Sequence, residues 1–192
     1  MPRPRADGLV LTPGASAGRD HPGLVAIDLA LHEVGIEAAR VEFPAQAAGR
    51  RRTDPPAVCM QTVRTATEDL AGTLGVPTRR IAVGGRSFGG RMCSLAVAEG
   101  FEVAALVLVS YPLHPPDRPD RLRTAHFGEL RVPCLFVSGR RDAFGTPDEL
   151  ELHTKGIPGP VTLALVDGDH GLRRREAEVA EIVAAWLSER GR

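Results

Sequence analysis

Residues 81–91, which read IAVGGRSFGGR, decide the fold of this chain. The apolar, β-branched start of the stretch predicts a strand, and the residues from Phe88 to Glu99 predict a helix. Ser87 lies between the two, with a glycine two residues before it and another two residues after it. This pattern, G-x-S-x-G, is expected where a sharp turn holds a strained serine clear of a sheet, because side chains at the glycine positions would collide. We therefore interpret Ser87 as a candidate nucleophile, the alternative being an ordinary glycine-rich turn.

The composition is that of a soluble globular protein, with 43% hydrophobic and 25% charged residues in a chain of 192. A chain of this length is expected to form one domain, residues 1–192, that buries roughly 70% of its unfolded surface. The formal net charge is zero, which does not suggest a nucleic-acid or acidic-membrane partner. No apolar run approaches the ~20 residues that a membrane span needs.

The termini and cysteines bear on location. Residues 1–5 carry basic residues with no apolar segment after them, so they do not predict a signal peptide. Cys59, Cys93 and Cys134 are far apart and lie in apolar contexts. We interpret them as buried free thiols in a reducing compartment, with no disulfide frame and no zinc site. A cytoplasmic protein is expected.

Strand-like and helix-like segments alternate along the chain. Six strands, near residues 9, 39, 82, 105, 134 and 163, predict a three-layer α/β fold with a mainly parallel sheet and helices on both faces. In such sheets a site lies beyond the carboxyl ends of the strands. Residues 111–131 are rich in proline and are read as a loop with at most one helical turn, too short for a cap domain.

A serine nucleophile needs a base and a group that orients the base. Asp142 and His170 each follow a predicted strand at the same edge as Ser87, in the chain order Ser, Asp, His. Asp117 is the alternative acid, and His170 could instead be a turn residue.

Asp167 and Asp169 flank His170 and suggest a metal site with Asp142, but no second histidine has ligand spacing. We therefore predict no metal.

The remaining candidates surround this constellation. Two backbone N–H groups, of Phe88 and Ala15, are expected to stabilise an oxyanion. Side chains predicted to line a substrate pocket are Ser16, Arg86, Tyr111 and His114. The basic run at residues 50–52 lies on the same edge. With Arg86 it could bind a carboxylate on a substrate, although such arginines more often pair with a residue such as Asp54 or face water.

Several short motifs, spread over nearly the whole chain, occur together in one known superfamily. They are TPGA, DHP, GRR, GGRSFGGR, YPLHPP, SGRRDAFGTP and GDH, at residues 12–15, 20–22, 49–51, 84–91, 111–116, 138–147 and 168–170. With these motifs the chain resembles the α/β-hydrolase superfamily. More closely it resembles the dienelactone-hydrolase-like branch that includes testis-expressed protein thirty and NSL complex subunit three.

The resemblance implies a Ser/Asp/His site at the three positions already chosen. Pro13 stands where such proteins often have histidine, and Phe88 replaces a common methionine. Neither change removes an expected N–H donor.

The sequence thus predicts a serine hydrolase that acts on a small ester or related acyl compound through a covalent acyl-enzyme, without a cofactor. Two alternatives stay open: a non-catalytic interaction module on the same fold, and a peptidase or acyltransferase. The oligomeric state and the physiological substrate are not predicted.

Overall fold

The computed structural model describes residues 6–189, so residues 1–5, on which the signal-peptide prediction depends, lie outside the described part. The elements in chain order are β1 (Gly8–Thr12), α1 (Pro22–Glu33), β2 (Glu37–Arg40), α2 (Pro44–Ala47), α3 (Pro56–Leu74), η1 (Thr78–Arg80), β3 (Ile81–Arg86), α4 (Phe88–Ala98), β4 (Leu106–Val109), η2 (Phe127–Glu129), β5 (Cys134–Gly139), α5 (Pro147–Thr154), β6 (Val161–Val166) and α6 (Glu176–Ser188).

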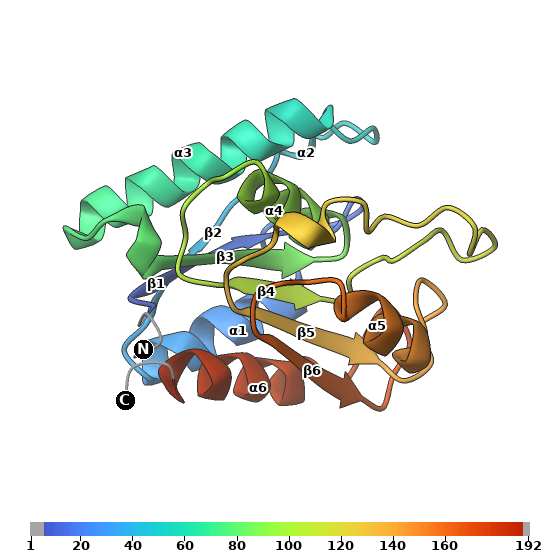
Figure 1. Cartoon of the computed structure of the whole chain (residues 1–192). Helices are drawn as coiled ribbons and strands as arrows, with labels where there is room; N and C mark the ends of the chain where they lie inside the picture. Colours follow the sequence, from blue (N-terminus) through green and yellow to red (C-terminus); the bar gives the residue numbers. More distant parts are fainter. Residues whose placement is uncertain (1–5, 190–192) are drawn as a thin grey trace.

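One parallel sheet of six strands runs through the molecule in the order β2-β1-β3-β4-β5-β6. Helices α3 and α4 cover one face, and α1 and α6 cover the other (Figure 1). This is the three-layer arrangement that the alternating pattern predicts.

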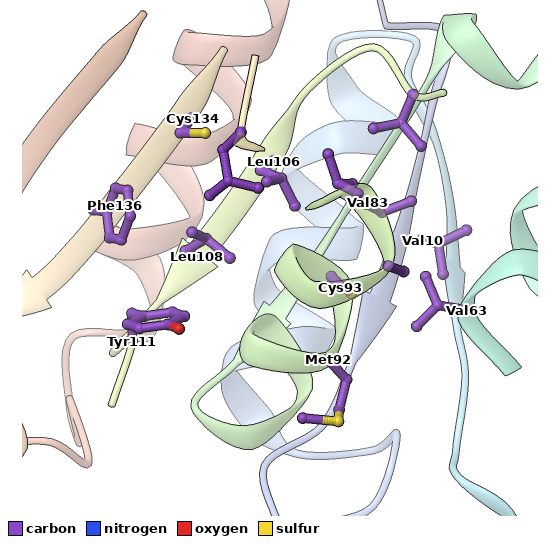
Figure 2. Packing of buried hydrophobic residues seen from close by; sticks show 14 of the residues in the cluster. Val10, Val63, Val83, Met92, Cys93, Leu106, Leu108, Tyr111, Cys134 and Phe136 are labelled. Carbon is purple, nitrogen blue, oxygen red and sulfur yellow. The ribbon is translucent and has the colours of Figure 1, made fainter. Parts of the chain in front are cut away.

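The central strands are buried on both faces, as strands covered by helices on each side must be. Every residue of β4 and β5 is buried. On one face, strand residues such as Val83, Leu106 and Phe136 pack with Met92 and Cys93 of α4 (Figure 2). A second apolar cluster joins the opposite face of the sheet to α1 and α6.

One element is not expected from the sequence. The strand predicted near residue 39 is β2, which ends at Arg40, and a short helix, α2, then begins at Pro44. Its start is set by side-chain contacts that no periodicity reveals: Gln46 Oε1 accepts the Phe43 N–H at 3.3 Å, and Asp54 Oδ2 accepts the Ala45 N–H at 2.7 Å.

The topology brings two loops together. From β1 the chain first adds β2 on one side and then β3 on the other, so the loops after β1 and β3 meet beyond the carboxyl ends of the strands at a topological switch point. Between β4 and β5 the described chain forms only η2 and irregular structure, with no inserted cap. No helix within residues 6–189 is long and apolar enough to cross a membrane.

Candidate active site

Ser87 lies in a strained turn at the end of β3. Its φ of 50° and ψ of −114° are rarely adopted by a residue with a side chain, at a cost of about 1–3 kcal/mol. The turn is held by the Ser87 N–H, which donates to the Val109 carbonyl at 2.8 Å, and by the Arg91 N–H, which donates to the Ser87 carbonyl at 3.1 Å. Gly85 and Gly89 pack against Thr12 so closely that a Cβ atom on either would collide with it. The packing of β1, β3 and α4 therefore fixes the serine in this conformation.

Ser87, His170 and Asp142 form one hydrogen-bonded chain. Ser87 Oγ lies 2.9 Å from His170 Nε2, and His170 Nδ1 lies 2.9 Å from both carboxylate oxygens of Asp142. Because a carboxylate only accepts hydrogen bonds, Nδ1 carries the proton and Nε2 of the neutral ring is left to accept the serine proton. Asp142 is only 2% exposed, so its charge is balanced by these bonds rather than by water. The arrangement can take a proton from Ser87 and hold the resulting imidazolium.

Phe144 supports these three residues in two ways that the sequence pattern around Asp142 does not predict. Its backbone N–H donates to Asp142 Oδ1 at 2.8 Å, and its ring stacks on the His170 ring with centroids 4.0 Å apart. The first contact is an Asx turn, a recurrent local bond between an aspartate and the N–H two residues later. The only sequence feature that points to this role is the presence of an aromatic residue two positions after Asp142.

Arg86 holds the backbone of the loop that carries His170. Its Nη2 donates to the His170 carbonyl at 2.9 Å, and burial lowers the pKa of its guanidinium, while the charges of Asp142 and Asp169 raise it. The side chain predicted to line the pocket is thus partly used in holding His170.

The two candidate oxyanion donors flank Ser87. Phe88 is the first residue of α4, so its N–H is one of those that a helix start leaves unpaired. Ala15 belongs to the loop after β1, and a Cβ atom built on the preceding Gly14 would lie 3.9 Å from Ser87 Cβ. Among residues 6–189, neither the Phe88 N–H nor the Ala15 N–H donates to another group of the protein. Both donors are therefore available to a ligand.

Residues 5–187 match the family described as the alpha/beta hydrolase domain. The chain belongs to this family. Solved structures with a similar fold include an alpha-beta serine hydrolase homologue from Coxiella burnetii, with a TM-score of 0.76 and 17% identity over 95% of this chain and 86% of that one. Est1E from Butyrivibrio proteoclasticus has a TM-score of 0.74 and 16% identity, over 97% and 89% of the two chains. Dienelactone hydrolase from Anabaena variabilis has a TM-score of 0.72 and 18% identity, over 98% and 87%.

The predicted fold class, an α/β-hydrolase fold with six parallel strands and no cap in the described residues, is therefore confirmed. Within this α/β-hydrolase domain, two of the expected pocket residues have other contacts. Tyr111 is 1% exposed, packs on Phe127 and Phe136, and donates its hydroxyl to the Arg123 carbonyl at 2.7 Å. It is a core residue.

His114 is also buried. Its Nδ1 lies 2.8 Å from the Pro115 carbonyl, its Nε2 lies 3.5 Å from Glu149 Oε1, and its backbone N–H donates to the Phe144 carbonyl at 3.2 Å. These contacts tie the loop after β4 to the loop that follows Asp142. They lend no support to a role in a pocket for His114.

Ser16 lines an open cavity of about 500 Å³, together with Ala15, Gln46, Arg50 and Arg51; its role in a substrate pocket stays a prediction. The cavity adjoins the loop that carries the Ala15 N–H. Asp54, the suggested partner of the basic run, accepts the backbone N–H of Ala45 instead, and no ion pair with Arg50 or Arg51 is present in the described chain.

The other acids near the edge have different roles. Asp117 is exposed, and the contact with His170 is made by Asp142. Asp167 pairs with Arg141 and, at 3.3 Å, with Arg175, and Asp169 accepts the Gly171 N–H at 2.8 Å. Within residues 6–189 no group of three or more histidine, cysteine or acidic side chains is arranged to hold a metal ion.

Proposed function

We propose that this α/β-hydrolase domain is a serine hydrolase that cleaves small esters or related acyl compounds. The observation that carries the proposal is the hydrogen-bonded chain from Ser87 through His170 to Asp142, which begins at a serine held in a strained turn. Buried carboxylates and strained residues are costly, and they are found together where a site is preorganised for chemistry.

The proposed reaction has two halves. Ser87 Oγ attacks the acyl carbonyl while its proton passes to His170 Nε2, and the imidazolium then protonates the leaving alcohol. Water next attacks the acyl-enzyme with His170 again as base, which releases the acid and restores Ser87. Asp142 keeps the imidazole in the required tautomer. The N–H groups of Phe88 and Ala15 would stabilise the oxyanion in both tetrahedral intermediates.

A preference for small acyl groups is consistent with the lack of a cap domain among the described residues. Within the described residues, the segment between β4 and β5 forms only η2 and irregular structure, which is too little for a helical cap over the serine. An open site buries less of a ligand and excludes water poorly. We therefore propose carboxylesterase-like activity, with modest kcat/KM on short activated esters.

The same proposal extends to location and branch. Cys59 and Cys93 are buried free thiols, which supports a reducing, cytoplasmic compartment. The motifs around Ser87 and Asp142 support a place in the dienelactone-hydrolase-like branch.

The test is hydrolysis of p-nitrophenyl acetate by the wild-type protein and by Ser87→Ala. We expect kcat/KM to fall by about 10⁴-fold in the variant, with an unchanged circular dichroism spectrum. Equal turnover by the two folded proteins would refute the assignment of the nucleophile.

A further inference from the structure

The side chain of Gln46 reaches from α2 to the loop after β1. Its Nε2 donates to the carbonyl oxygens of Gly14 at 2.7 Å and of Ala17 at 2.9 Å. Its Oε1 accepts the Phe43 N–H at 3.3 Å. Two carbonyls on one side and an N–H on the other leave only one orientation for the amide. Neither an acid nor an apolar side chain of this length could make all three bonds.

One of these bonds sets the direction of the Ala15 N–H. The Gly14 carbonyl and the Ala15 N–H belong to the same peptide unit, and in a planar trans peptide they point in opposite directions. No cis peptide bond occurs in residues 6–189. Since the Gly14 oxygen points to Gln46, the Ala15 N–H points away from Gln46.

This peptide unit adjoins the nucleophile. A Cβ atom on Gly14 would lie 3.8 Å from the Arg86 carbonyl oxygen and 3.9 Å from Ser87 Cβ. Glycine accepts a wide range of backbone angles, so Gly14 itself puts little restraint on the peptide that follows it, and the contacts of the Gly14 carbonyl help to fix the orientation of that peptide. Besides Gln46, the Gly14 carbonyl has one further hydrogen bond within the described chain, a longer one of 3.3 Å from the Ala17 N–H.

Helix α2, which carries Gln46, is held in place close to Phe88, the residue that supplies the second proposed oxyanion donor. Asp54 Oδ2 accepts the Ala45 N–H at 2.7 Å, which pairs one of the free N–H groups at the start of α2. The ring of Phe43, the residue before α2, meets the Phe88 ring edge-on with centroids 5.6 Å apart. Phe43 and Gln46, three residues apart at the start of this helix, thus contact both segments from which the proposed oxyanion donors come.

We propose that Gln46 is a positioning residue that fixes the Ala15 N–H toward Ser87 and so completes the oxyanion site. The inference rests on the proposed function and adds the residue that sets one of its two donors. The hydrogen bonds of the Gln46 side chain go to Phe43, Gly14 and Ala17 rather than to Ser87, so Gln46 would act through the Gly14–Ala15 peptide.

The first test is Gln46→Met, which keeps the length of the side chain and removes both donors. Loss of a whole oxyanion donor costs about 10²- to 10³-fold in kcat, so loss of its orientation is expected to lower kcat for p-nitrophenyl acetate about 10- to 100-fold. KM should stay within about threefold, because the oxyanion develops only in the transition state.

Gln61→Met is the matched control. Gln61 is the other glutamine of the chain. Its Nε2 donates to Thr65 Oγ1 at 3.3 Å, on the exposed side of α3, and to no other group within residues 6–189. This variant should keep wild-type kcat. A Gln46→Met protein that folds and keeps its kcat, or that raises KM alone, would overturn the inference.

A second measurement does not depend on turnover. The Ala17 N–H bonds to the carbonyl that Gln46 holds, so hydrogen exchange in a peptide covering residues 13–18 should be at least several-fold faster in Gln46→Met than in Gln61→Met or the wild type. Absence of Ser87-dependent turnover in the wild type would sink the proposed function. Unchanged exchange in this loop would sink the role of Gln46 even if the enzyme is active.

Discussion

Gly89→Ala is expected to destabilise the fold and to slow the proposed reaction at the same time. A Cβ atom at this position would lie 2.5 Å from both the Pro13 carbonyl oxygen and Thr12 Oγ1, and 2.8 Å from the Thr12 carbonyl carbon. Neither neighbour can give way easily. The Thr12 hydroxyl donates to the Gly84 carbonyl at 2.9 Å, and the backbone of β1 is paired with strands on both sides.

The magnitude follows from two opposing terms. Replacing glycine by alanine inside a helix gains up to about 1 kcal/mol, whereas overpacking costs typically about 1–3 kcal/mol and occasionally more. Because the collision is with backbone, the overpacking cost should lie near the upper end of that range, about 2–3 kcal/mol, which leaves a net loss of about 1–3 kcal/mol. For a protein of this size that lowers Tm by about 2–12 °C.

Urea denaturation of Gly89→Ala and Gly72→Ala measures the difference directly. Gly72 lies in α3 with nothing within 4 Å of its Cβ position, so this control should become more stable by up to about 1 kcal/mol. The residual folded Gly89→Ala protein should also have a lower kcat, because α4 carries the Phe88 N–H. If the two alanine variants were equally stable, the packing argument for the G-x-S-x-G turn would be wrong.

Three further outcomes are expected. Asp142→Asn should lower kcat/KM by about 10³- to 10⁴-fold, because His170 would then adopt the wrong tautomer. Asp117→Asn should leave initial rates near those of the wild type. A larger loss of activity in Asp117→Asn than in Asp142→Asn would mean that Asp142 is not the acid that orients His170. In a series of p-nitrophenyl esters from acetate to palmitate, activity should fall beyond about six acyl carbons, and an optimum at long chains would reveal an apolar tunnel. Burial, and then the charge of Arg91, lowers the pKa of His126 to about 4 from 6.5. As the pH falls below about 6.5, His126 takes up a proton in the unfolded chain before it does so in the folded protein. The stability that the neutral, buried His126 contributes is therefore full above about pH 6.5 and decreases toward pH 4. His126→Gln should flatten the fall of Tm between pH 7 and 4.5 and the exposed His32→Gln should not, whereas equal slopes in both variants would contradict the burial of His126.

Much of the fold could be predicted because its elements bury apolar runs of recognisable period. The strand predicted near residue 163, for example, is β6 (Val161–Val166). Ser87, Asp142 and His170 could be chosen together because each follows a strand, and parallel strands deliver their carboxyl ends to one edge. This reasoning needs only the order of the elements, which hydrophobic periodicity supplies.

The rest depends on contacts that periodicity does not encode. Helix α2 is four residues long and is held by side chains, Gln46 among them, that reach it through loop geometry. Phe144 acts on His170 through a turn whose shape appears only in three dimensions. Tyr111 follows a strand, as a pocket residue would, but its ring turns into the core. A sequence places such a residue at an edge without telling which way its side chain points.

The most direct test of the central claim is covalent labelling of the wild-type protein with a fluorophosphonate, followed by intact mass measurement and peptide mapping. We expect one adduct per chain on Ser87, since a serine activated by His170 reacts far faster than an ordinary hydroxyl. The adduct should be absent in Ser87→Ala and formed much more slowly in His170→Ala. A wild-type protein that stays unlabelled, or that carries the adduct on another residue, would contradict the assignment of Ser87 as the nucleophile and favour a non-catalytic role for this hydrolase fold.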